Sequence, residues 1–236
     1  KPDYTQVYYT MGLALRNKGE LKASVACYQQ VVKNRPDDAD AHNNLAAALQ
    51  HSGDLVAAID CYKLALKIDP NCAEAYNNMG IALQAKGDIA AAIDCYKKAI
   101  ELRPAYTNAH NNMGHALSDG GALEASVACY RKALGIDPHS AQTHNNLGNA
   151  LMKAGEFEKA IEHFDFITAI ETDPSRPEFW FNSKSLALEC FYNLGDYLEL
   201  GKRIKMLAES GDINLRVAAV SAFVSQQLKI EDPYPF

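Results

Sequence analysis

Pairs of asparagines recur along this chain at a constant interval. A primary amide offers a carbonyl acceptor and an NH₂ donor, which complement the N–H and C=O of a peptide bond. Asparagine is also a mediocre helix former, so its repeated use needs a reason other than helix propensity. The chemistry indicated is hydrogen bonding to polypeptide backbone. The pairs are Asn43-Asn44, Asn77-Asn78, Asn111-Asn112 and Asn145-Asn146.

Cysteines recur at the same interval. Equivalent positions on stacked helices lie about 8–10 Å apart, whereas a disulfide needs Cα atoms closer than about 7 Å. The same distance excludes a row of metal ligands. We therefore expect free thiols that act as small apolar filler, and a reduced, cytoplasmic setting. These cysteines are Cys27, Cys61, Cys95 and Cys129.

The histidines could in principle act in catalysis or bind a metal. Three of them, His42, His110 and His144, stand where other units have tyrosine, so we expect rings that fill a packing slot. Only His51 and His115 fall on a helix face that could meet a ligand. No HExxH, CxxC, GxGxxG, P-loop or GxSxG motif occurs. The sequence thus predicts no catalytic residues, no metal site and no cofactor, and the protein is not expected to be an enzyme.

Prolines define the repeating unit, since Pro36, Pro70, Pro104 and Pro138 are evenly spaced and set a 34-residue period. With proline at position 32, a glycine stands at position 15 and predicts the end of a first helix, helix A. The proline closes a second helix, helix B, because its predecessor is pushed out of the helical region. The five units are Thr5–Asp38, Ala39–Cys72, Ala73–Tyr106, Thr107–Ser140 and Ala141–Pro174.

Helical periodicity assigns a face to each position. At 100° per residue, positions 4, 7, 8 and 11 of helix A form one apolar stripe, and the small residue at position 8 lets helix B come close. Position 6 falls on the opposite side, together with positions 2, 9 and 13. Position 5 lies on the flank toward the next unit. The second asparagine of each pair is therefore expected on the surface that the stacked A helices present.

This unit resembles the tetratricopeptide repeat (TPR), with matching residues over roughly Thr5 to Pro174. The resemblance implies an all-α, right-handed superhelical solenoid of helix–turn–helix repeats, each packed on its neighbours. Residues 175–212 are predicted to form a sixth, diverged helical repeat. Residues 213–236 are predicted to form a capping helix and an apolar tail, through which the protein could self-associate.

The asparagine ladder is similar to the TPR superhelix of the O-GlcNAc transferase family, where such residues hold extended protein substrates along a concave groove. An alternative is that the pairs bond to each other and to neighbouring backbone and so knit the repeats together. We favour this alternative for position 5 and ligand binding for position 6. The predicted peptide-binding residues are Asn44, Asn78, Asn112 and Asn146, with His115 and Asn149 at position 9.

Composition limits the partners. The 236 residues carry a net charge of −6, which argues against a phosphate-binding surface and hence against nucleic acid. No apolar run approaches the ~20 residues of a membrane span, so no membrane is expected. Among positions 2, 9 and 13 only Lys153 is cationic. A clamp for a C-terminal carboxylate is therefore disfavoured, and the ligand should be neutral or slightly basic.

Two functions follow from these observations. The leading hypothesis is a protein–protein interaction scaffold that binds an extended peptide or partner segment in a concave groove. The alternative is the substrate-selecting TPR arm of a larger enzyme, a transferase or an oxygenase, whose catalytic domain follows the chain. The position where the native reading frame ends would separate the two.

Overall fold

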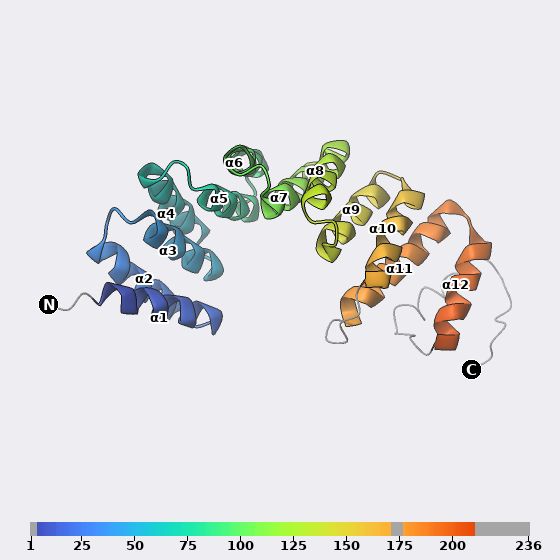
Figure 1. Ribbon diagram of the computed structural model, residues 1–236, viewed down its shortest axis with the longest axis horizontal. Helices are drawn as coiled ribbons and strands as arrows, with labels where there is room; N and C mark the ends of the chain where they lie inside the picture. Colours follow the sequence, from blue (N-terminus) through green and yellow to red (C-terminus); the bar gives the residue numbers. More distant parts are fainter. Residues whose placement is uncertain (1–3, 171–176, 211–236) are drawn as a thin grey trace. The chain divides into compact units, whose positions relative to one another are not determined.

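A computed structural model describes residues 4–170 and 177–210, with side chains described from 4 to 169 and from 182 to 205. Within these ranges the chain is built of α-helices joined by short turns, without a β-strand (Figure 1). The predicted capping helix and tail, residues 213–236, lie outside the described residues. The twelve helices of the described ranges are α1 (Thr5–Asn17), α2 (Leu21–Asn34), α3 (Ala39–His51), α4 (Leu55–Ile68), α5 (Ala73–Lys86), α6 (Ile89–Leu102), α7 (Thr107–Asp119), α8 (Leu123–Ile136), α9 (Ala141–Lys153), α10 (Phe157–Ile170), α11 (Pro177–Leu194) and α12 (Tyr197–Ser210).

Local sequence signals set the helix ends. Gly87 ends α5 with φ 94°, a left-handed conformation that glycine adopts without steric strain. Asp88 follows and caps α6, because its Oδ1 accepts a hydrogen bond from Ala91 N at 3.2 Å. The predicted glycine turn between helix A and helix B is confirmed. The other glycines with positive φ at these turns are Gly19, Gly53, Gly121, Gly155 and Gly195.

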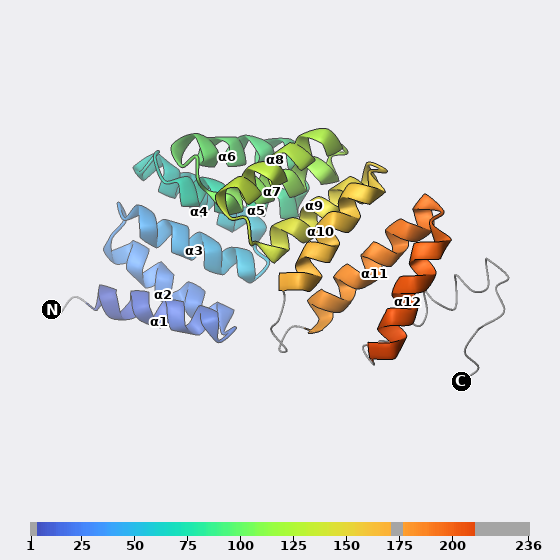
Figure 2. The same ribbon diagram turned by 45° about the vertical axis from the view of Figure 1, so that its right-hand side comes forward.

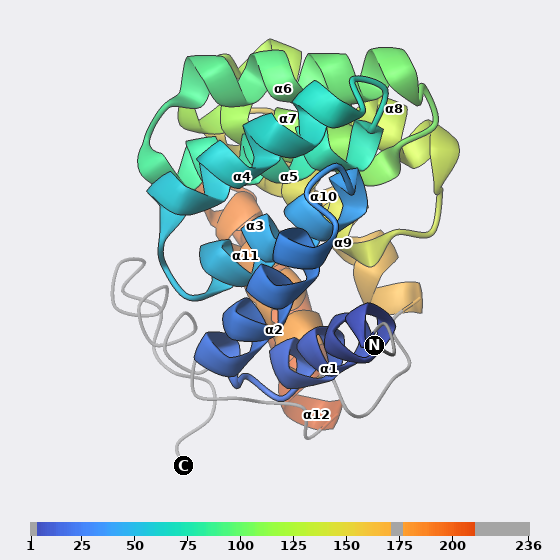
Figure 3. The same ribbon diagram turned by 90° about the vertical axis from the view of Figure 1, so that its left-hand side faces the viewer.

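The helices group into two compact units, residues 1–122 and residues 123–236. In the first unit, hairpins α1–α2, α3–α4 and α5–α6 are joined by the contacts α2–α3, α4–α5 and α6–α7. Its helices follow one another in chain order from α1 at one end to α6 and α7 at the other (Figures 2 and 3). In the second unit, each helix from α8 to α12 packs on the next.

Helix A meets helix B through the predicted apolar stripe. The residue at position 8 lies directly under the ring at position 24, so a Cβ added to Gly80 would fall 2.5 Å from Cε1 of Tyr96. The same addition at Gly148 would fall 2.6 Å from Cε1 of Phe164. Both rings are fully buried. The expectation that a small residue at position 8 permits close helix packing is confirmed.

A second face of helix A joins successive hairpins. We call positions 3, 7 and 10 the docking face. At the α2–α3 junction, Ala41, Leu45 and Ala48 of this face share a buried cluster with Tyr28 and Val31 of the preceding helix B. Short alanine side chains allow the two helices to approach closely, and the aromatic ring fills the space between them.

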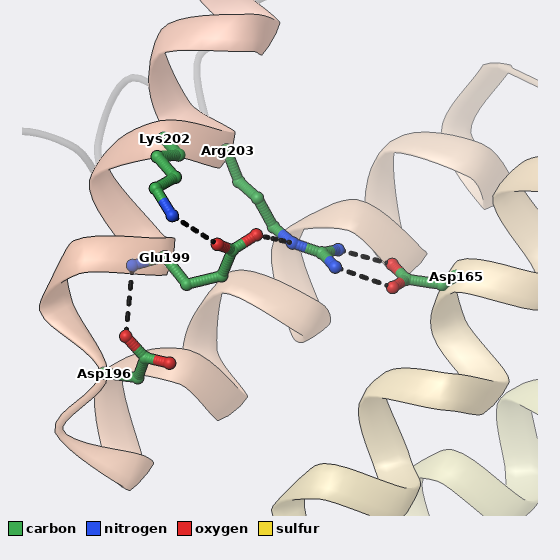
Figure 4. A network of polar contacts seen from close by, with 5 residues as sticks. All are labelled: Asp165, Asp196, Glu199, Lys202 and Arg203. Atoms are coloured by element: carbon green, nitrogen blue, oxygen red, sulfur yellow. Dashed lines mark hydrogen bonds and ion pairs between the residues drawn. The ribbon is translucent and has the colours of Figure 1, made fainter.

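A polar network adds to the packing of the second unit (Figure 4). Nη1 and Nη2 of Arg203 on α12 donate to Oδ1 and Oδ2 of Asp165 on α10, at 2.6 and 2.9 Å. The guanidinium also lies 4.6 Å from the ring centroid of Phe191 on α11. The hydrogen bonds to Asp165 raise the pKa of Arg203. This bidentate geometry fixes α12 against α10 and α11.

The repeated cysteines are free thiols, as expected. Burial raises the pKa of Cys27, Cys61 and Cys129, and raises that of Cys95 to about 11. A thiol that stays protonated is a poor nucleophile and a poor metal ligand. These cysteines therefore act as packing residues in helix B.

The position-4 histidines have a polar role that the sequence did not indicate. Nε2 of His42 lies 2.8 Å from the carbonyl oxygen of Pro36, and Nε2 of His110 lies 2.9 Å from that of Pro104. Each ring thus donates a hydrogen bond to the proline that closes the preceding unit. Besides filling a packing slot, the ring ties the start of helix A to the end of the previous helix B.

Candidate peptide-binding face

The asparagine ladder consists of Asn44, Asn78 and Asn112 in the first unit and Asn146 in the second. All four side chains are half-buried, on the side of helix A opposite the apolar stripe. Around them, the residues at positions 2 and 13 of every repeat are exposed. The predicted side of helix A is therefore the accessible one.

In the first unit, each ladder amide reaches back to the preceding helix A. Nδ2 of Asn78 donates to Oδ1 of Asn43 at 3.4 Å, and Nδ2 of Asn112 donates to Oδ1 of Asn77 at 2.9 Å. The acceptors are buried position-5 residues. Position 6 thus also links neighbouring repeats, a role that we assigned from the sequence to position 5 alone. The reason is angular: position 6 lies beside the docking face, within reach of the preceding repeat.

Between the first and second repeats, the same kind of hydrogen bond forms with a different acceptor. Nδ2 of Asn44 donates to the hydroxyl of Tyr9 at 2.6 Å and to the carbonyl of Asp40 at 2.8 Å. Burial, and then the carboxylate of Asp40, raises the pKa of Tyr9, so its hydroxyl stays neutral. Tyr9 stands at position 5, where the next repeats have asparagine, and the sequence analysis missed it.

These bonds decide which amide atom remains for a ligand. Oδ1 of Asn78 accepts from Nδ2 of Asn77 at 3.3 Å, whereas Oδ1 of Asn44 and Oδ1 of Asn112 accept no hydrogen bond from any described residue. Both oxygens belong to half-buried side chains on the accessible side. The first unit therefore offers oriented acceptors, which suit the N–H groups of an extended chain.

His115 belongs to a polar cluster that links three helices of the first unit. The amide of Gln84 on α5 has Nε2 2.6 Å from Nδ1 of His115 and 2.8 Å from Oδ2 of Asp119, both on α7. Its Oε1 accepts from the hydroxyl of Tyr96 on α6 at 3.1 Å. The tyrosine orients the amide so that its NH₂ faces Nδ1 of His115, which also lies 3.3 Å from Oδ2 of Asp119. The ring tautomer that accepts this hydrogen bond at Nδ1 carries its proton on Nε2.

Gln84 was not predicted, although a signal for it exists. Gln50 stands at the equivalent position of the preceding repeat and accepts from Tyr62 at 2.9 Å, as Gln84 does from Tyr96. A glutamine at position 12 paired with a tyrosine at position 24 is thus a recurring feature. Because both residues belong to one repeat, their constant spacing could have been read from the sequence.

The second unit contributes two predicted residues, both on α9. Oδ1 of Asn146 accepts from Nε2 of Gln142 at 2.9 Å, and Nδ2 of Asn149 donates to the carbonyl of Asn145 at 2.9 Å. Nδ2 of Asn146 makes no hydrogen bond to a described residue. In this unit the available ladder group is therefore a donor.

The charge of the accessible side in the first unit is negative. Its exposed charged residues at positions 2, 9 and 13 are Asp40, Glu74 and Asp119, with Lys and Arg absent from these positions. Such a surface favours a neutral or basic ligand. Among the side chains that the structure describes, no group of three or more His, Cys, Asp or Glu could hold a metal ion.

Comparison with known families settles the nature of the repeats. Three family models match: one tetratricopeptide repeat model over residues 37–105, a second TPR model over 12–53 and 114–155, and a third over 141–175. Together they span more than half of the chain. It belongs to the tetratricopeptide repeat family. Curated proteins gave no match.

Solved structures of other TPR proteins share this all-α fold. The crystal structure of PilW, a type IV pilus biogenesis factor, is 18% identical, with a TM-score of 0.75, 93% of this chain and 99% of that one covered. PilF of Pseudomonas aeruginosa is 19% identical, with a TM-score of 0.72 and coverage of 93% and 97%. MamA is 25% identical, with a TM-score of 0.62 and coverage of 72% and 92%.

None of the helices in the described ranges is both long and apolar enough to cross a bilayer.

Proposed function

We propose that this TPR chain is a protein-interaction scaffold that holds an extended segment of a partner along its asparagine ladder. The observation that carries the proposal is the hydrogen bonding of the side-chain amides of Asn44 and Asn112. Their Nδ2 atoms are held by the preceding helix A, while their Oδ1 atoms accept no bond from the described residues and lie on the accessible side.

The spacing of the ladder residues also supports the binding of an extended segment. Packed helices lie about 8–10 Å apart, and an extended chain advances about 3.3 Å per residue. The available ladder oxygens of the first unit lie on α3 and α7, two A-helix spacings apart, and would thus meet the backbone of a ligand at positions roughly five to six residues apart. In the first unit, His115 adds an Nε2–H donor beside them. In the second unit, Asn146 and Asn149 provide their own amides.

The ligand class follows from the atoms that remain available. Acceptor oxygens and the carboxylates of Asp40, Glu74 and Asp119 favour a partner segment rich in N–H donors and neutral or basic in charge. The proposed role is binding, not catalysis, and the proposed partner is a protein.

The test uses short linear peptides selected from a phage-displayed library on the whole chain. Calorimetry then compares the variant Asn112→Ala with the matched control Asn77→Ala. Both variants lose the same bond between repeats and should lose stability, by about 1–3 kcal/mol for an unsatisfied buried group. Asn112→Ala also loses the accessible oxygen and should bind the peptide about 1 kcal/mol more weakly, whereas Asn77→Ala keeps that oxygen, removes only the bond that orients it and should weaken binding by less.

A second arm asks whether the peptide backbone is recognised. N-methylation should weaken binding at peptide amides roughly five to six residues apart, because a methylated amide has no proton to donate. Equal affinities of the two variants, or peptides whose affinity depends on side chains alone, would refute the ladder as the binding element.

A further inference from the structure

The side chain of Gln84 decides which nitrogen of His115 carries the proton. A carboxylate only accepts hydrogen bonds, so the amide atom 2.8 Å from Oδ2 of Asp119 is the NH₂ nitrogen. The same NH₂ lies 2.6 Å from Nδ1 of His115 and donates to it. The neutral ring therefore presents an Nε2–H donor, and this ring is exposed on the accessible side of α7.

His51, the other exposed histidine on this side of the first unit, has the opposite form. Its Nδ1 lies 2.7 Å from the carbonyl oxygen of Ala47. A carbonyl oxygen only accepts, so Nδ1 carries the proton and Nε2 of the neutral ring is an acceptor. The partner of Nδ1 thus determines what each ring offers to a ligand, and the amide of Gln84 makes His115 a donor.

Among the three ladder helices of the first unit, only α7 combines an available acceptor with a side-chain donor at position 9. On α3 position 9 is Ala47, and on α5 it is Ile81. Oδ1 of Asn78 on α5 is also occupied by a hydrogen bond from Asn77. On α7, His115 follows Asn112 by three residues, a spacing that places two side chains next to each other on a helix surface, with Cβ atoms about 5–6 Å apart.

We propose that Asn112 and His115 together anchor one residue of the bound segment by its backbone, with Gln84 as the positioning residue. The inference rests on the proposed function. In an extended chain, the N–H and C=O of one residue face the same neighbour and can bond to it together. Oδ1 of Asn112 accepts from that N–H, and Nε2–H of His115 donates to that C=O.

This anchor sets the register of the ligand, because α3 offers acceptors alone and binds an N–H without the accompanying C=O. It also imposes a specificity that acceptor oxygens alone do not explain. The anchored residue must be extended and must have an N–H, which excludes proline at that position. Its side chain points away from the two bonds and is not selected by them.

The first arm of the test measures the tautomers in the whole chain without ligand. Long-range proton–nitrogen correlation spectra at about pH 8 should show the proton of His115 on Nε2 and that of His51 on Nδ1. Gln84→Met removes the NH₂ and leaves a carboxylate beside Nδ1, so His115 should change toward the Nδ1–H form. Gln50→Met is the matched control, since it loses the same kind of tyrosine bond but should leave His115 unchanged.

The second arm uses calorimetry with the phage-selected peptide. N-methylation of the anchored residue should weaken binding about three- to tenfold, and Asn112→Ala should abolish this effect. An ester in place of the following peptide bond weakens the C=O of the anchored residue as an acceptor, with a loss of similar size. His115→Phe and Gln84→Met should abolish the ester effect, whereas Gln50→Met should keep it. At the residue that meets α3, N-methylation should weaken binding and the ester should not.

The outcomes separate the anchor from the ladder. The positioning role is overturned if His115 does not carry its proton on Nε2, or if Gln84→Met leaves the tautomer as it was. The anchor is overturned, while the ladder stands, if the ester effect persists in His115→Phe or if proline is tolerated at the anchored residue. A peptide whose affinity does not respond to N-methylation at any position would refute the ladder itself, and the anchor with it.

Discussion

At the scale of single residues, the ladder shows how one amide serves two purposes. Nδ2 of Asn112 is bound to Asn77, which fixes the side chain, and fixation leaves Oδ1 with a defined direction. An acceptor held in place loses little conformational entropy when a ligand binds. A structural bond between repeats therefore prepares the remaining atom for recognition.

A pair of histidines in the second unit provides a prediction about pH. Nδ1 of His144 lies 2.9 Å from Nδ1 of His163, and Nε2 of His144 lies 3.1 Å from the carbonyl of Pro138. Burial, followed by His144, lowers the pKa of His163 from 6.5 to about 4. Between these values the unfolded chain binds the proton and the folded chain does not, so stability falls as pH drops from 6.5 toward 4.

His163→Cys removes the titrating ring and should therefore reduce this pH dependence. Cysteine is chosen because it is the residue at the same position of the other four units. From pH 7.5 to 4.5 the wild type should lose about 1–2 kcal/mol more stability than the variant, allowing for partial solvent exposure of the ring. Urea denaturation at both pH values measures the difference. Identical losses would show that His163 does not titrate in this range.

Arg203 gives a second prediction at this scale. Arg203→Lys keeps the charge but cannot form two parallel hydrogen bonds with Asp165 or stack on Phe191 in the same way. The free energy of unfolding should fall by about 1–2 kcal/mol. The control is Lys202→Arg, since the ion pair of Lys202 with Glu199 joins residues of one helix and is exposed. Thermal melts compare the two, and equal melting temperatures would contradict a stabilising role.

At the scale of helices, the contact between position 8 and position 24 fixes the distance within a hairpin. Gly80→Ala should destabilise the chain by about 1–3 kcal/mol, because its Cβ would overlap the buried ring of Tyr96. Gly135→Ala is the matched control, since its Cβ would meet nothing within 4 Å on the exposed face of α8. It should be neutral or stabilising by about 0.5 kcal/mol. Denaturant melts of both variants test this.

At the scale of the whole molecule, contacts are local along the chain. Each hairpin packs on its sequence neighbours, and the helices form two compact units. Gly80→Ala should therefore lower hydrogen-exchange protection most in α4 to α7 and little in α10 and α11. Gly148→Ala, which clashes with Phe164, should do the reverse. Equal loss of protection in both units for either variant would contradict local cooperativity.

The sequence by itself determined the repeat, the helix pairs and the stripe through which the two helices of a pair meet. The constant repeat length, the turn glycines and the small residue at position 8 act within one unit, so their consequences follow from helix geometry alone. Turns such as Gly87 and contacts such as Gly80 with Tyr96 could be predicted for this reason. The accessible side of the ladder followed in the same way, from the angular period of the α-helix.

Only the tertiary structure decided which atoms meet between repeats. Periodicity gives the side on which Asn112 lies, but its partner depends on the offset between neighbouring A helices, which no single unit contains. The same holds for Gln84 with His115 and Asp119, residues of different repeats. Arg203 and Asp165 are paired across a part of the chain where the repeat pattern has faded, so the sequence offered no register from which to pair them. Contacts between elements depend on relative placement, and packing alone fixes it.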